Sequence, residues 1–133
     1  MQSFYKEIVL DHFQRPRNRH ELEQATLEEH INNPLCGDHV TVYANIRDEA
    51  FEEVSFTGRG CSISQASASM LTEQLTGASR EEAEQRIQAF LHMMHTEENE
   101  ALGELAALKG VVQTPNRIRC ATLAWEAMQR ALD

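Results

Sequence analysis

Residues 40–61 read VTVYANIRDEAFEEVSFTGRGC. Apolar residues alternate with polar ones from Val40 to Ile46 and again from Val54 to Phe56, on either side of an acidic turn at Asp48-Glu49. Alternation of this kind places one set of side chains on one face of a strand. The stretch therefore predicts a β-hairpin with one covered face, which ends where Gly58-Arg59-Gly60 interrupts the second strand.

Helical spacing of apolar residues predicts the elements around this hairpin. Ser3 is a suitable cap for a first helix, which Pro16 stops, and the aromatic side chains of this helix are expected to pack on the domain. Ser79-Arg80-Glu81-Glu82 matches a capping box at the start of another helix. The predicted helices cover residues 3–15, 64–76, 79–94 and 121–132, with a shorter apolar segment at 102–108.

These elements predict an α+β fold, in which a small antiparallel sheet has helices packed against it. Residues 25–30 are expected to add a short edge strand, and residues 1–133 are expected to form a single domain. No run of about 18 apolar residues is present, so no membrane span is expected. A net charge of −9 disfavours nucleic acid as a partner. This charge balance suits a cytoplasmic protein whose partners are other proteins.

Three cysteines, Cys36, Cys61 and Cys120, fall in predicted connections between these elements. Each could be a small buried apolar residue, but a disulfide framework is disfavoured because the count is odd and no secretory signal is present. Asp38 lies two residues after Cys36, and Gly37 between them allows the backbone to turn. Three thiolates and one carboxylate are donors that suit a tetrahedral zinc ion or a small iron–sulfur cluster.

The neighbours of the cysteines favour this reading. Cys61 and Cys120 are predicted at or just before helix starts, where the partial positive charge stabilises a thiolate. His39 adjoins Asp38 but should point to the opposite face of its strand. Because a carboxylate holds a soft ion less firmly than a fourth thiolate would, the site should be exchangeable, and a released thiolate could accept sulfur from the persulfide of another protein.

Four segments together resemble the U-type iron–sulfur cluster assembly proteins, the family of IscU, SufU and the N-terminal domain of NifU. The resemblance covers nearly the whole chain and is closer to SufU than to IscU, because Arg119 stands where IscU has histidine and residues 102–113 look like the insertion typical of SufU. The matching segments are Asp11-His12-Phe13 with Arg15-Pro16-Arg17-Asn18, Asn33-Pro34-Leu35-Cys36-Gly37-Asp38, Gly58-Arg59-Gly60-Cys61-Ser62-Ile63-Ser64 with Ala66-Ser67-Ala68-Ser69-Met70, and Cys120-Ala121-Thr122-Leu123-Ala124-Trp125.

The resemblance implies a three-stranded antiparallel sheet with about five helices. It also implies a metal site built from Cys36, Asp38, Cys61 and Cys120. From their positions in the sequence, Gly37 and Gly60 are expected to let the backbone come close to this site, and Arg117 either steadies its anionic ligands or is a solvated surface charge. A pyridoxal-phosphate cysteine desulfurase of the SufS type is the implied partner, and apo-proteins or a scaffold would receive the sulfur or cluster. The chain lacks the Leu-Pro-Pro-Val-Lys segment that chaperones recognise in IscU.

Two roles follow from the resemblance and use the same ligands. A SufU-like protein would be a zinc-dependent sulfurtransferase in which Cys36 accepts the persulfide sulfur. An IscU-like protein would be a scaffold for a [2Fe-2S] cluster, with Cys120 as the sulfur acceptor. Independently of the family, a third reading is a zinc ion that only stabilises the fold.

Overall fold

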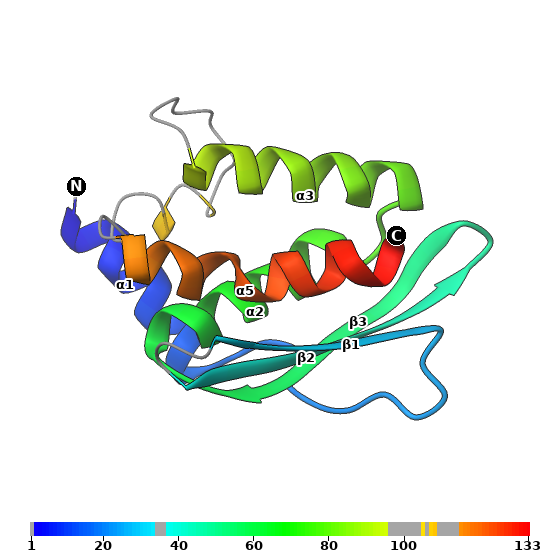
Figure 1. The fold of residues 1–133 in the computed structure, drawn as a ribbon, viewed down its shortest axis with the longest axis horizontal. Helices are drawn as coiled ribbons and strands as arrows, with labels where there is room; N and C mark the ends of the chain where they lie inside the picture. Colours follow the sequence, from blue (N-terminus) through cyan, green and yellow to red (C-terminus); the bar gives the residue numbers. More distant parts are fainter. Residues whose placement is uncertain (1, 34–36, 96–104, 106, 109–114) are drawn as a thin grey trace.

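A computed structural model describes residues 2–33, 37–95, 105, 107–108 and 115–133 of the chain (Figure 1). Three strands form one antiparallel sheet in the order β1-β2-β3, and helices pack against it, which confirms the predicted α+β fold. About five helices were expected, and the described residues contain four long ones. The elements are α1 (Gln2–Gln14), β1 (Leu27–Asn33), β2 (Asp38–Arg47), β3 (Ala50–Arg59), α2 (Ser62–Leu75), α3 (Arg80–His95) and α5 (Pro115–Leu132).

The hairpin of β2 and β3 forms as the alternation predicts. Val42 pairs with Phe56, and both side chains are buried. Asp48 and Glu49 form the turn with φ angles of 53° and 64°. Two consecutive positive φ angles are typical of the two-residue type I′ turn, whose twist matches that of the flanking strands. The acidic turn therefore sets the register of the pairs next to it, and an irregularity between Asn45 and Ile46 shifts the register of the rest of the hairpin by one residue.

The edge strand β1 is longer than the predicted residues 25–30. It begins at Leu27 and continues to Asn33, which pairs with Asp38 at the start of β2. Its inward side chains become more buried toward that end, where Ile31 and Asn33 are both covered. Pairing with β2 extends the strand beyond what its own alternation indicates.

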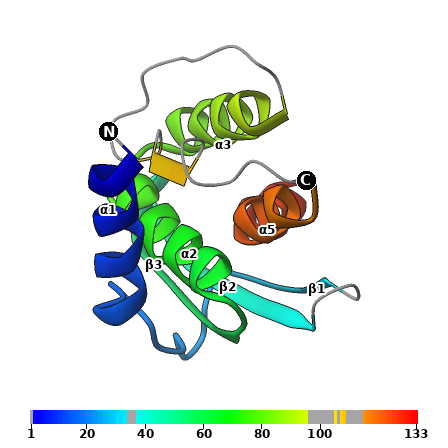
Figure 2. The same ribbon diagram turned by 90° about the vertical axis from the view of Figure 1, so that its left-hand side faces the viewer.

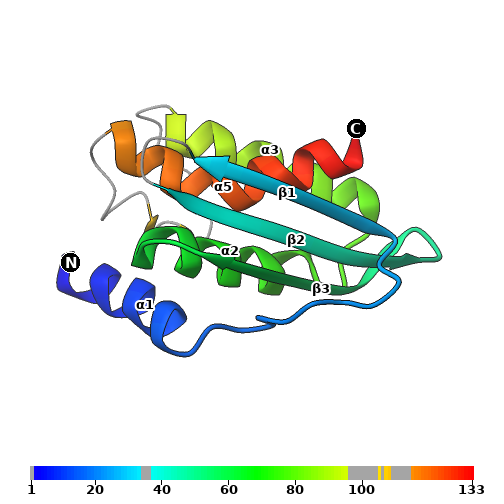
Figure 3. The same cartoon turned by 60° about the horizontal axis from the view of Figure 1, so that its bottom comes forward.

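The helices lie in layers on one face of the sheet. Figure 2 shows α2 and α5 next to the sheet, α3 beyond them and α1 beside α2. Figure 3 shows the opposite face of the sheet, which no helix of the described residues covers. Trp125 of α5 is fully buried in the core and stacks on Phe90 of α3, with 4.2 Å between the ring centroids. None of the helices among these residues is long and apolar enough to cross a membrane.

A polar link fixes α5 against α2 inside the core. The indole N–H of Trp125 donates to the Ser67 hydroxyl over 3.0 Å, and that hydroxyl donates to the Ala121 carbonyl. Buried polar groups are tolerated when they are hydrogen-bonded in this way. The link sets the position of the α5 residues next to Ala121, which include Cys120.

The orientation of α1 differs from the prediction. The helix ends before Pro16 as expected, but Phe13 is 41% exposed and does not pack into the domain. Val9 and His12 form the buried face instead, and the imidazole Nδ1 of His12 lies 2.8 Å from the hydroxyl of Ser69 in α2. The expectation was wrong for Phe13 because the hydrogen bond of a buried histidine orients the helix. The side chains of residues 2–5 are not described.

The capping box at α3 provides a stability test. The Ser79 hydroxyl accepts a hydrogen bond from the Glu82 backbone N–H, and the Glu82 carboxylate accepts one from the Ser79 N–H, each over 3.1 Å. Ser79→Ala should lower the free energy of unfolding by about 1 kcal/mol in chemical denaturation. Ser62→Ala, at the start of α2, is the control, since its hydroxyl makes no hydrogen bond within the described residues.

The contribution of the Glu82 carboxylate to this cap should also depend on pH. Hydrogen bonds from the backbone and side chain of Ser79 lower the pKa of Glu82. The ionised carboxylate therefore stabilises the fold above its unfolded pKa, and this contribution is lost as the pH falls through the lower folded value. The difference in free energy of unfolding between the wild type and Glu82→Gln should therefore shrink in acid. A difference that stays constant with pH would contradict this account of the cap.

Candidate metal centre

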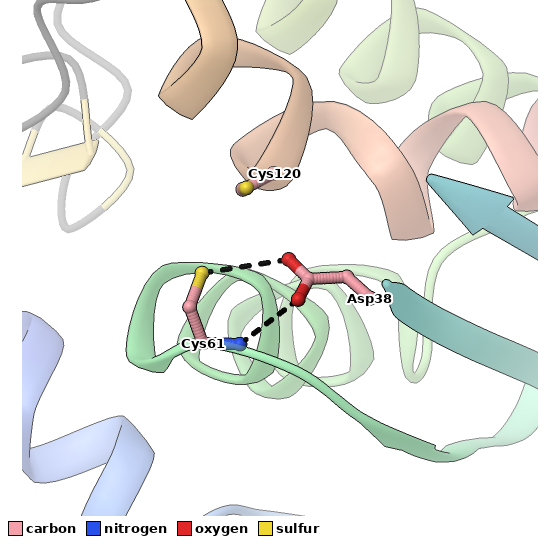
Figure 4. Close-up of side chains that lie close together, drawn as sticks. All are labelled: Asp38, Cys61 and Cys120. Atoms are coloured by element: carbon pink, nitrogen blue, oxygen red, sulfur yellow. Dashed lines mark hydrogen bonds between the residues drawn. The ribbon is translucent and has the colours of Figure 1, made fainter. Parts of the chain in front are cut away.

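Three elements bring Asp38, Cys61 and Cys120 together at one end of the molecule (Figure 4). Asp38 is the first residue of β2, Cys61 lies between β3 and α2, and Cys120 lies in α5. One candidate ligand atom from each side chain lies within 4.8 Å of the other two. Because the three residues are far apart in the sequence, the site forms only in the folded domain.

The Asp38 carboxylate is 3% exposed and contacts Cys61 twice. Its Oδ1 accepts a hydrogen bond from the Cys61 backbone N–H over 3.2 Å, and its Oδ2 accepts one from the Cys61 thiol over 3.5 Å. The next residue, His39, turns to the other face of the sheet, where its ring centroid lies 5.7 Å from that of His30. This confirms the prediction that His39 does not face the site.

Cys61 is the N-cap residue of α2. Its carbonyl accepts hydrogen bonds from the Gln65 backbone N–H over 3.2 Å and from the Ser64 hydroxyl over 3.1 Å. The positive end of the helix dipole stabilises the Asp38 carboxylate beside Cys61. The predicted placement of Cys61 in a strand-to-helix turn is confirmed, and its side chain is partly exposed.

Cys120 lies inside a helix, whereas the sequence predicted a connection. The helix α5 begins at Pro115, so Cys120 is in its second turn. Proline suits the first turn of a helix because its missing N–H would have no partner there. The stabilisation expected from a helix N-terminus is therefore weaker at Cys120, since the dipole effect falls off beyond the first turn. The Cys120 side chain is only 3% exposed.

Glycine is required at position 60 by close packing at the site. A Cβ on Gly60 would lie 2.7 Å from the Asp38 Oδ1 and would also collide with the Ser64 hydroxyl. Gly37 has a φ angle of +74°, a left-handed conformation that favours glycine. Ser64 was not expected at the site. Its position three residues after an N-cap, where a hydroxyl can reach back to the cap carbonyl, was the available signal.

Other predicted site residues are placed differently. Cys36 lies outside the described residues. Arg117 has an exposed side chain that makes no hydrogen bond or ion pair within the described part of the chain. Arg119 lines a separate pocket with His95 and Glu126. The structure therefore brings together three of the four predicted ligands and leaves Arg117 as a prediction.

The donors fit a zinc ion. Tetrahedral zinc with ligand bonds of about 2.0–2.3 Å requires donor atoms roughly 3.7 Å apart at most. The candidate donor atoms of Asp38, Cys61 and Cys120 lie within 4.8 Å of one another. This limit exceeds the zinc value by about 1 Å, a difference that rotation of the side chains can remove. Two sulfurs and one carboxylate oxygen leave one coordination position for a further donor.

Gly60→Ala tests the packing around the carboxylate. The added methyl group should displace Asp38 and lower zinc affinity about tenfold or more, as measured by competition with a chelator of known affinity. Gly77→Ala is the control because Gly77 lies just past the other end of α2, where φ is +85° and a Cβ would meet nothing within 4 Å. It should lower stability and leave zinc affinity unchanged. Equal zinc affinity in the two variants would contradict the packing argument.

The chain is similar to known proteins over nearly its whole length. Residues 4–133 match the family described as the NifU-like N terminal domain. The chain is 36% identical to the zinc-dependent sulfurtransferase SufU of Bacillus subtilis, covering 99% of this chain and 91% of that protein. It is 39% identical to the iron–sulfur cluster assembly scaffold protein IscU of Streptococcus pyogenes serotype M1, covering 96% of this chain and 82% of that protein.

A solved structure supports the fold assignment. The crystal structure described as an iron–sulfur cluster assembly scaffold protein for the SUF system from Fervidobacterium islandicum AW-1 superposes with a TM-score of 0.90. It is 30% identical to this chain, and the match covers 99% of this chain and 98% of that one. The similarity thus extends over the whole fold and is not confined to the cysteine motifs.

Proposed function

The chain belongs to the NifU-like N-terminal domain family, and on that premise we propose that it serves iron–sulfur cluster assembly as a zinc-bound sulfur acceptor. It takes persulfide sulfur from a cysteine desulfurase of the SufS type and passes it to apo-proteins or a scaffold. The observation that carries this proposal is the meeting of Asp38, Cys61 and Cys120 at one end of the domain.

Four residues hold the zinc ion in this proposal: Cys36, Asp38, Cys61 and Cys120. Cys36 is the fourth donor because it is two residues from Asp38 in the sequence and supplies the third thiol. Zinc, when bound, keeps the thiols deprotonated at neutral pH. Asp38 is the weakest of the donors for a borderline-soft ion, which suits a site whose ligands must be exchanged during transfer.

The transfer step is a thiol–persulfide exchange. A released thiolate of the chain attacks the outer sulfur of the desulfurase persulfide, and a new S–S bond forms as the original S–S bond breaks. The desulfurase cysteine leaves as a thiolate, so no external oxidant or reductant is required. Cys36 is the proposed acceptor, and the burial of Cys120 supports this choice, because a buried sulfur would require the site to open first.

The proposal predicts that the protein stimulates its cognate cysteine desulfurase. Added to the desulfurase with L-cysteine and a reductant, the zinc-loaded protein should raise the rate of alanine formation. Cys36→Ala should abolish stimulation, and mass spectrometry should locate the extra sulfur of the wild type on the peptide containing Cys36. Sulfur found on Cys120 would contradict the assignment of the acceptor, and absence of stimulation by the wild type would overturn the proposed function.

Two substitutions of Asp38 separate an exchangeable zinc site from one that only stabilises the fold. Asp38→Asn keeps an oxygen that can accept the hydrogen bond from the Cys61 N–H, whereas Asp38→Ala removes it. Both should reduce stimulation, and Asp38→Ala should also lower the melting temperature more. Asp48→Asn, in the exposed hairpin turn, is the charge-matched control. Full stimulation by Asp38→Ala together with lower stability would favour a structural zinc.

A second function is favoured by the similarity to IscU at 39% identity. In that role the same ligands hold a [2Fe-2S] cluster that is assembled on the chain and passed on. Anaerobic reconstitution with iron and sulfide should then produce a visible chromophore that transfers to an apo-ferredoxin. A protein that stays colourless and retains about one zinc ion would count against the scaffold role and for sulfur transfer.

A further inference from the structure

A pocket of about 440 Å³ adjoins the metal centre. It lies where the end of α1 and the segment after it meet the end of β3, and it shares Gly60 with the site that contains Cys61. The segment after α1 is held along β3 by a hydrogen bond from the Phe56 N–H to the Asn18 carbonyl over 3.0 Å. The lining residues are Phe13, Pro16, Arg19, Arg59, Gly60 and Gln65.

Two arginines of this pocket lack a carboxylate partner within the described residues. The Arg59 side chain makes no hydrogen bond or ion pair there, and the Arg19 side chain donates only to the Gly58 carbonyl, over 3.0 Å. Arg15 and Arg17, by contrast, each lie 2.7 Å from an Asp11 carboxylate oxygen. In a chain of net charge −9, two such guanidinium groups in one pocket form a local site for a carboxylate.

The side-chain amide of Gln65 brings to the same pocket a buried oxygen that has no hydrogen-bond donor among the described residues. Its side chain is 5% exposed, and its Oε1 accepts no hydrogen bond within the part of the chain that the structure describes. A buried acceptor of this kind is stabilised by an incoming N–H or O–H donor. A polypeptide segment supplies both groups, because an acidic side chain carries the carboxylate and the backbone carries N–H donors.

An apolar surface continues from the pocket onto α1. Phe13 lines the pocket and is 41% exposed, and Leu10, one turn earlier, is 48% exposed. They are the large apolar side chains that the structure finds exposed among the described residues. Side chains three apart lie on the same face of a helix. Aromatic side chains and arginine are enriched at protein interfaces, and an exposed apolar patch beside them indicates an interaction site.

We propose that this pocket anchors an acidic segment of the cysteine desulfurase. A carboxylate of the segment pairs with Arg59 and Arg19, and a neighbouring apolar side chain packs on Phe13 and Leu10. Because Gly60 precedes Cys61, the anchored segment lies at the edge of the metal centre. The inference rests on the proposed function, since it specifies how the sulfur donor is held.

The test measures the affinity of the zinc-loaded full chain for its cognate desulfurase at low and high salt. Arg59→Glu should weaken binding about tenfold or more at low salt, and the loss should be smaller at high salt. Phe13→Ser should weaken binding at both salt concentrations. In a double variant with Arg19→Glu, the losses should be less than additive, because both arginines pair with one carboxylate.

Arg47→Glu is the matched control. It makes the same charge change on an exposed arginine at the far end of β2, and it should bind the desulfurase with wild-type affinity at equal zinc content. Equal affinity of Arg59→Glu and Arg47→Glu would overturn the inference.

Succinate is titrated into the chain alone as a probe for a small-molecule site. Succinate binding that Arg59→Glu abolishes, with desulfurase affinity unchanged, would also overturn the inference.

The two proposals fail in different ways. A wild type that binds the desulfurase but does not raise alanine formation contradicts the proposed function, while the comparison of Arg59→Glu with Arg47→Glu still decides the anchor. If the wild type and Arg59→Glu stimulate the desulfurase equally well, the result supports sulfur transfer and overturns the anchor. Melting temperature and zinc content of each variant show that the fold and the metal centre are intact.

Discussion

The contact between the Asp38 carboxylate and the start of α2 determines the geometry of the metal centre. One carboxylate accepts hydrogen bonds from both the N–H and the thiol of Cys61. This contact requires that β2 begin in the correct register, because side chains alternate along a strand. A slip of one residue would turn Asp38 to the face that His39 now occupies. The pairing of Asn33 with Asp38 and of His39 with Arg59 fixes that register at the strand end.

Cys120, the third candidate ligand, is positioned by a different part of the core. Cys120 adjoins Ala121, whose carbonyl accepts the Ser67 hydroxyl, and Ser67 also accepts the Trp125 indole N–H. The stacking of Trp125 on Phe90 connects this link to α3. Zinc affinity should therefore respond to the packing of α2, α3 and α5 as well as to the ligands themselves. The geometry of the site therefore depends on two independent constraints, the register of the sheet and the packing of the helices.

Much of the fold and of the candidate site could be predicted because the sequence patterns that indicate them are local. The alternation of β2 and β3, the capping box at Ser79 and the turn before Cys61 each depend on neighbours within a few residues. The last helix was predicted from residue 121, whereas α5 begins at Pro115, because proline is suited to the first turn of a helix. The pocket between Arg19 and Arg59 had no sequence signal, since it forms only when the segment after α1 lies along β3.

The side chains of the candidate site differ in exposure, and in the proposed sulfur transfer this difference would determine the side from which the sulfur arrives. Asp38 and Cys120 are buried, whereas Cys61 is partly exposed beside Gly60 and the arginine pocket. An incoming persulfide would therefore approach from the Cys61 edge. If a ligand leaves the metal during exchange, Asp38 still accepts the hydrogen bond from the Cys61 N–H at the positive end of α2. Its charge is then not left buried without compensation, so the cost of opening the site is lower than for an isolated carboxylate.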